Sequence, residues 1–205
     1  METLTPLLFA LGIGFTHAFE ADHLVAIINI VTNRDKTKLA LKDGIYWGLG
    51  HTSTILVIGL VFILGKMVVN EAIFGYLEGV VGVALIVLGG FRLRKLFKPV
   101  QQKLDHKHSG HKLAYGIGLI HGLAGSGAVI LIAMTEIKSA FTEIVYLLVF
   151  GAGSIVGMLI AATIFSLPFS KKMASMKRLQ QGMVIFSSLL CMGYGGFILY
   201  EIAMG

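Results

Sequence analysis

GIGFTHAFEADHLVAI, residues 12–27, is the stretch of sequence that decides the fold, because a related stretch, GIGLIHGLAGSGAVIL, follows at residues 116–131. The two align at a shift of 104 residues with five identical positions, and His17 then pairs with His121. Each stretch opens a long apolar part of the chain. The alignment therefore predicts that the protein is built from two related halves.

The composition of the chain predicts a membrane protein. Of its 205 residues, 56% are hydrophobic and only 14% are charged, and the mean hydropathy is +0.83. A helix needs about 20 apolar residues to cross the hydrocarbon core of a bilayer. The chain offers six such stretches, which leaves no room for a soluble globular enzyme. They lie at residues 4–31, 44–65, 72–93, 113–136, 141–166 and 180–203.

The repeat groups these stretches into a first half at residues 1–98 and a second half at 113–205, joined by a linker at 99–112. Because each half crosses the membrane an odd number of times, the second half must enter from the opposite side. Inverted repeats of this kind are typical of secondary transporters, whose binding sites lie between the halves. We expect an all-α membrane protein of six transmembrane helices, arranged as two inverted three-helix repeats.

The basic residues indicate which way the chain crosses the membrane. Fifteen of the 17 lysines and arginines lie in or beside three of the predicted loops, at residues 32–43, 94–112 and 167–179. By the positive-inside rule these loops are cytoplasmic and both termini lie outside, in a plasma (inner) membrane. The net charge of +6 is thus explained by topology and does not call for a nucleic-acid partner.

Four ionisable residues lie together inside the first predicted span: His17, Glu20, Asp22 and His23. A single charged residue at the centre of a membrane helix costs about 2.5–3.5 kcal/mol on insertion scales, so such residues normally face a cavity, a partner or an ion. Imidazoles with carboxylates suit divalent transition metals. A polar cluster that only holds helices together is the alternative interpretation.

Helix geometry constrains how this cluster can act. On a regular helix, His17, Glu20 and His23 form one stripe, whereas Asp22 lies about 140° away from His17. Either Asp22 orients a histidine from outside the ligand shell, or the helix opens near the motif. His51, in the second predicted span, lies at a similar depth to His23 and completes the predicted metal ligands.

The second half offers two further candidates, His121 and Ser126. His121 lies at the same predicted depth as His23 and His51, although a structural hydrogen bond between helices would explain His51 and His121 equally well. Three glycines and Ser126 directly follow His121. A broken helix there could present backbone groups to a substrate.

Two other groups of polar residues receive weaker predictions. His106, His108 and His111 could handle metal in the cytoplasmic linker, but interleaved lysines favour an ordinary solvated segment. Glu78 either lines an entry path or extends to the membrane surface. The remaining acidic residues near the outer boundary are predicted to be surface groups: Glu71, Glu136, Glu143 and Glu201.

The sequence from His17 to His23, HAFEADH, resembles the H-x4-D-H signature of the nickel/cobalt transporter family. GHTST at residues 50–54 is similar to that family's second-helix segment, and HGLAGSGA at 121–128 is similar to shorter six-span relatives of the urease-accessory and sulfite-exporter type. The resemblance implies transport of Ni(II) or Co(II), with His17, Asp22, His23 and His51 as the matched positions. Glu20 replaces an aspartate that is usual in the larger transporters.

These observations predict a transporter that moves a divalent transition metal, nickel or cobalt, by alternating access. It would not be an enzyme and would hold no permanent cofactor, and its partners would be lipid, the metal and, as open possibilities, a second copy or a metallochaperone. Two alternatives remain: an exporter of a small sulfur oxyanion such as sulfite, and a membrane metal sensor that does not transport. The chain carries no phosphate-binding loop of the kind that ATPases use.

Overall fold

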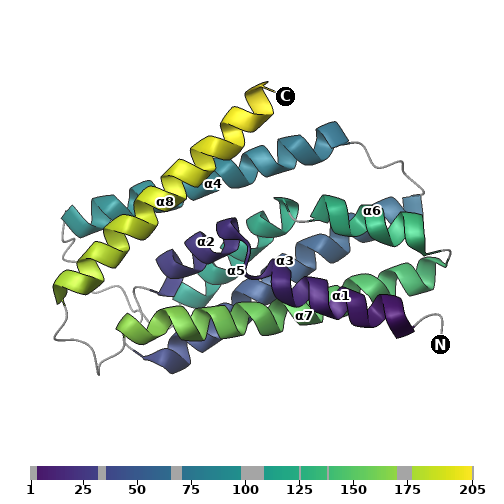
Figure 1. Ribbon diagram of the computed structural model, residues 1–205, viewed down its shortest axis with the longest axis horizontal. Coiled ribbons are helices and arrows are strands. Elements are labelled where there is room, and N and C mark those ends of the chain that lie inside the picture. Colours follow the sequence, from purple (N-terminus) through teal and green to yellow (C-terminus); the bar gives the residue numbers. More distant parts are fainter. Residues whose placement is uncertain are drawn as a thin grey trace.

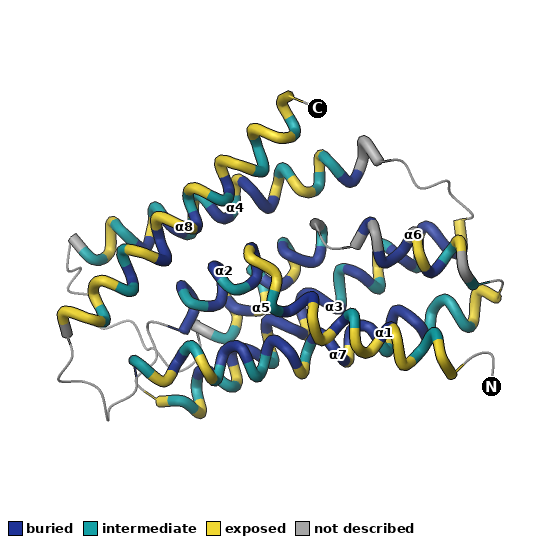
Figure 2. The backbone as a smooth tube through the Cα atoms, viewed as in Figure 1, coloured by how far each residue is buried: buried dark blue, intermediate teal, exposed yellow. Residues whose placement is uncertain are grey.

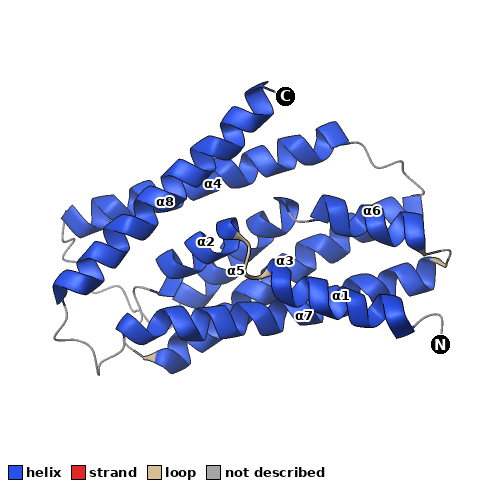
Figure 3. Cartoon of the chain, viewed as in Figure 1, coloured by secondary structure: helices blue, strands red, loops and turns tan. Residues whose placement is uncertain are grey.

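The computed structural model describes residues 4–31, 36–65, 71–97, 109–124, 126–137, 139–169 and 177–204. Within these ranges the chain is helical and forms no strand, as predicted (Figure 3). A short 3-10 turn at Leu167–Phe169 follows the seventh helix. The helices are α1 (Leu4–His17), α2 (Ala21–Val31), α3 (Thr37–Gly65), α4 (Glu71–Phe97), α5 (Ser109–Ala124), α6 (Ser126–Glu136), α7 (Ala140–Ser166) and α8 (Lys177–Met204).

Four of the described helices are long and apolar enough to cross a membrane by themselves: α3, α4, α7 and α8. The pair α1 and α2 meets the same criteria as one span that bends by 55°. The predicted continuous span at 4–31 is therefore broken, and the one at 113–136 is also found as two helices, α5 and α6, of 16 and 11 residues. The protein is a multi-pass helical membrane protein with four or five candidate spans among the described residues.

The long helices run along the long axis of the molecule (Figure 1). Successive passes alternate in direction, and α1 with α2 runs opposite to α5 with α6. The most extensive packing joins α3 to α7, α3 to α5, α1 to α7 and α4 to α8. The α4–α8 pair lies beside the other helices and contacts them mainly through α2 and α5 (Figure 1).

Glycines allow α1 to approach α7, and α5 to approach α3, closely enough for backbones to touch. A side chain at any of four glycines would collide with a carbonyl group of the facing helix. The two sets of contacts correspond when 104 is added to the α1 numbers and 103 is subtracted from the α7 numbers. They are Gly14 with Phe150 and Gly153 with Leu11 in the first pair, and Gly118 with Trp47 and Gly50 with Tyr115 in the second.

The distribution of apolar side chains fits a bilayer. Large apolar residues are exposed, among them Leu8, Val57, Val87 and Phe186. Exposed residues recur along the helices, as Figure 2 shows. Polar residues are instead found inside, where four histidines are buried. This inside-out pattern is expected when the surrounding solvent is lipid.

Candidate metal centre

The break in the first span brings the rings of two of the predicted histidines together, edge to face. His17 ends α1, and a tight turn follows in which the backbone amides of Phe19 and Glu20 donate to the carbonyls of Thr16 and His17. His23 then lies in the first turn of α2. As a result, the ring centroids of His17 and His23 are 4.5 Å apart, which the rise of a straight helix would not allow.

His51 and His121 complete a cluster of four imidazoles. The ring of His51, on α3, lies 5.1 Å from that of His17 and 5.0 Å from that of His23. The ring of His121, on α5, lies 5.5 Å from that of His23. All four side chains are buried, with at most 6% of each residue exposed. The structure thus brings together histidines from both halves of the sequence.

Hydrogen bonds hold the rings of His23 and His121, and a close contact with a carboxylate lies beside the ring of His17. The Nδ1 atom of His17 lies 2.9 Å from Oε1 of Glu20, and that of His23 lies 2.9 Å from Oδ1 of Asp22. The Nδ1 atom of His121 lies 3.1 Å from a backbone carbonyl, that of Ile117. Ionised carboxylates and carbonyls only accept hydrogen bonds, so Nδ1 of His23 and of His121 carries the proton and Nε2 of each neutral ring keeps its lone pair. The carboxylate beside Nδ1 of His17 favours the same tautomer there.

The free nitrogen atoms of the cluster are buried and have no hydrogen-bond partner. They are Nε2 of His17, His23 and His121, and both ring nitrogens of His51. One nitrogen from each of His17, His23 and His51 lies within 4.8 Å of the others, and Glu20, Asp22 and His23 form a second group with the same spacing. Imidazole rings anchored through Nδ1 by a carboxylate, with Nε2 free, are arranged as histidine ligands of metals commonly are.

Helix geometry left two interpretations of Asp22 open, and the structure contains features of both. The helix does open at the motif, and Asp22 also contacts His23 through its carboxylate. The Asp22 side chain is 13% exposed, whereas the Glu20 side chain is 58% exposed. The two carboxylates therefore differ in position: Asp22 lies among the buried rings, and Glu20 reaches toward open space.

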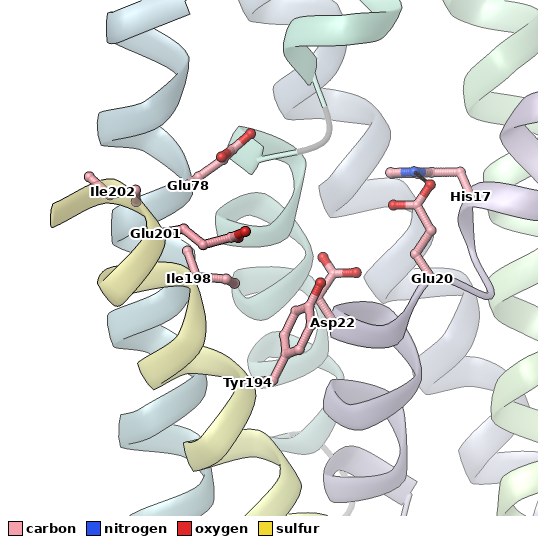
Figure 4. Close-up of a pocket in the computed structure, with 8 residues that line it drawn as sticks. All are labelled: His17, Glu20, Asp22, Glu78, Tyr194, Ile198, Glu201 and Ile202. Atoms are coloured by element: carbon pink, nitrogen blue, oxygen red, sulfur yellow. Dashed lines mark ion pairs between the residues drawn. The ribbon is translucent and has the colours of Figure 1, made fainter. Parts of the chain in front are cut away.

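A cavity of about 220 Å³ leads toward the cluster from the side of α4 and α8 (Figure 4). In Figure 4, Glu78 from α4 and Glu201 from α8 point toward the same space as Asp22. Of the two sequence interpretations of Glu78, the entry path fits this position. Glu201 is exposed, as predicted for a surface group, and it also lines the cavity. The lining residues are His17, Glu20, Asp22, Glu78, Tyr194, Ile198, Glu201 and Ile202.

Tyr194 also lines the cavity and was not predicted. A signal was present in the sequence, because Tyr194, Ile198 and Glu201 have the spacing of one helix face. This spacing is a weak indication of a site, because Glu201 stands close to the expected end of its span, where water solvates a carboxylate.

Of the three histidines predicted in the cytoplasmic linker, the structure describes only His111, which is not part of the cluster of four imidazoles. His106 and His108 lie outside the described residues. His111 is in the first turn of α5, ten residues before His121, and its Nδ1 atom lies 2.7 Å from Oδ1 of buried Asp43. The ring of Tyr46 stacks on His111 at 5.2 Å. Ser126 begins α6, but its side chain is outside what the structure describes.

Comparison with known proteins identifies two relatives of this chain. No protein-family model matches the chain, and no solved structure matches it. The chloroplast protein FOR GROWTH AND FERTILITY 2 of Arabidopsis thaliana is 25% identical, over 95% of this chain and 56% of the plant protein. The urease accessory protein UreH of Bacillus sp. (strain TB-90) is 34% identical over 182 residues, which cover 83% of this chain and 80% of UreH. This chain therefore belongs to the family of the urease accessory protein UreH.

Proposed function

We propose that this protein carries a divalent transition-metal ion across the membrane, and that His17, His23 and His51 bind the ion with help from Glu20 and Asp22. The observation that carries this proposal is the group of buried imidazole nitrogens without partners. One nitrogen atom from each of His17, His23 and His51 lies within 4.8 Å of the others, and a cation is the species that several lone pairs can share.

A purely structural cluster explains these atoms poorly. Leaving a buried polar atom unsatisfied costs about 1–3 kcal/mol, and five imidazole nitrogens are in this position. Histidines kept only to join helices would donate to one another or to backbone carbonyls. Here carboxylates and a carbonyl fix the Nδ1 side of three rings and leave the Nε2 side available.

Nickel is the first candidate for the transported ion, and cobalt is the second. Nitrogen and oxygen donors together suit several first-row metals, which differ mainly in preferred geometry. Membership of the UreH family favours nickel among these metals, because a urease accessory role implies nickel handling. In the proposed role the metal is the substrate and leaves the site at the end of each cycle.

The proposed architecture is six crossings in two inverted three-helix repeats, with α1–α2 and α5–α6 as broken crossings. The opposite directions of the two broken pairs support it (Figure 1), as do the matching glycine contacts in both halves. His23 comes from the first half and His121 from the second, so rocking of one half against the other would change the site directly. By the positive-inside rule, we propose that the basic loops lie on the cytoplasmic side of a bacterial-type inner membrane.

Export of a sulfur oxyanion is the weaker alternative, because four carboxylates line the cavity beside the site. Their negative charge would repel an anion before it reached the histidines. A metal sensor that does not transport would bind the ion but show no flux, so a transport assay separates it from the proposed function.

The test is metal uptake into proteoliposomes that contain the purified protein, supplied in turn with Ni(II), Co(II), Zn(II), Fe(II) and Mn(II). We expect saturable flux of nickel or cobalt in the wild type and in Ser53→Ala. Ser53 is a control on α3 whose hydroxyl bonds only its own helix, at the carbonyl of Leu49. His51→Ala should abolish the flux. Metal flux that survives His51→Ala, or no metal flux in the wild type, would contradict the proposal.

A further inference from the structure

We propose that Glu78 and Glu201 form an outer capture site for hydrated divalent cations, from which the ion passes to the histidine cluster. This inference rests on the proposed function and adds a second site to it. Glu78 is on α4, Glu201 is on α8, and both side chains are exposed and line the cavity that reaches Asp22 (Figure 4).

The charge of the cavity fits a cation. Four of its eight lining residues are acidic, and none is lysine or arginine. The apolar side chains of Ile198 and Ile202 form part of the wall beside these carboxylates. A cleft of one charge sign with apolar walls concentrates counter-ions and raises their rate of arrival.

The inner end of the cavity gives an independent indication of the ligand. His17 lines the same cavity, its side chain is 7% exposed, and its Nε2 atom has no hydrogen-bond partner. Its Nδ1 atom is already held by Glu20, so Nε2 is a lone-pair donor. The cavity thus connects outer carboxylates with an unused buried metal ligand, which is the order of sites that a cation would meet on entry.

The two sites differ in donor chemistry and should differ in selectivity. Glu78 and Glu201 offer oxygen atoms, and Tyr194 adds a phenol. Oxygen donors suit hard ions that keep part of their water, such as Mg²⁺ and Ca²⁺. The imidazoles favour transition metals. The outer site should therefore accept divalent cations in general, and the choice among metals should fall to the histidines.

The test compares wild type with the double variant Glu78→Gln/Glu201→Gln, using nickel supplied to proteoliposomes from each side in turn. Gln keeps the size of the side chain and removes its charge. We expect the half-saturating nickel concentration to rise about tenfold, within the range of electrostatic focusing. The rise should occur only for nickel supplied from the side of the C-terminus and only at low salt, with the maximal rate retained. Glu143→Gln is the matched control, because Glu143 is in the first turn of α7 and does not line the cavity.

Competition by Mg²⁺ gives a second measurement that a folding defect would not imitate. Millimolar Mg²⁺ should slow nickel uptake by the wild type more than a monovalent salt of equal ionic strength does, and the double variant should lose this difference. Unchanged half-saturation and unchanged Mg²⁺ sensitivity in the double variant would overturn the capture site alone. Absence of flux of any of the tested metals in the wild type would instead overturn the proposed function.

Discussion

The two broken helix pairs share a backbone plan but differ in chemistry. In α1–α2 the break is surrounded by His17, Glu20, Asp22 and His23, whereas at the shift of 104 residues α5–α6 has His121, Ala124, Ser126 and Gly127. Both pairs approach their neighbouring long helix through glycines at matching positions. The glycine contacts therefore recur in both halves of the sequence, while the ionisable residues around the breaks are concentrated in the first half.

We expect the largest effect on nickel binding from removal of a proposed ligand in the first half. His23→Ala should lower nickel affinity by more than about 100-fold, because even partners of metal ligands are worth 10–100-fold. Gly127 already stands at the corresponding position in the second half. Isothermal titration of nickel into the detergent-purified protein measures the change. A loss of less than threefold would show that His23 is not a ligand.

The aspartate that orients His23 should have the next largest effect. Asp22→Asn should lower nickel affinity about 10–100-fold, because an amide no longer fixes the proton on Nδ1 of His23. Ser126→Ala, at the matching position in the second half, should change the affinity less than about twofold on the same account. Equal losses in the two variants would refute the division of labour between the halves.

The glycine contacts should, by contrast, matter equally in both halves. Gly14→Ala and Gly118→Ala each place a Cβ atom against a carbonyl of the facing helix, at Phe150 or Trp47. Each should destabilise the protein by about 1–3 kcal/mol, as overpacking does. Thermal unfolding in detergent tests this.

The chain supplies matched controls for the glycine variants. Gly12→Ala and Gly116→Ala occupy corresponding positions two residues earlier, where a Cβ would meet nothing within 4 Å. They should be neutral or stabilising, because alanine is the better helix former. A large loss at Gly14 with none at Gly118 would mean that the two halves do not pack alike.

The smallest expected effect concerns a polar link that the first half alone carries. Asn29 of α2 donates to the carbonyl of Ser187 and to Sγ of Cys191, and it accepts from the hydroxyl of Ser188, all on α8. Ala133 stands at the matching position in α6. Asn29→Ala should destabilise the protein by about 0.6–2 kcal/mol, the range for hydrogen bonds between membrane helices. A change below 0.3 kcal/mol in reversible unfolding would contradict a stabilising role.

Hydropathy predicted much of this fold because lipid imposes a simple length rule on apolar segments. It could not place helix ends that extend beyond the membrane. Asp43, for example, stands in the predicted loop at 32–43, yet α3 already begins at Thr37 and Asp43 is buried against His111. Hydropathy reports which residues are apolar enough to contact lipid, and it does not detect where a helix ends beyond the membrane.

The histidine cluster was also largely predictable, because ionisable residues inside spans are rare and depth along a helix is easily counted. The rings of His51 and His121 lie 5.0 Å and 5.5 Å from the ring of His23. The outer cavity was not predictable, because it depends on how α4 and α8 pack. Glu78 and Glu201 are 123 residues apart in sequence, and no local pattern connects them.

X-ray absorption at the nickel edge of the loaded, purified protein tests most directly whether buried imidazoles hold the transported metal. The spectrum should contain the multiple-scattering signature of about three imidazole rings, matching His17, His23 and His51. This signature should weaken by about one ring in His51→Ala. A nickel ion surrounded by oxygen atoms alone, or a spectrum that His51→Ala leaves unchanged, would contradict the claim.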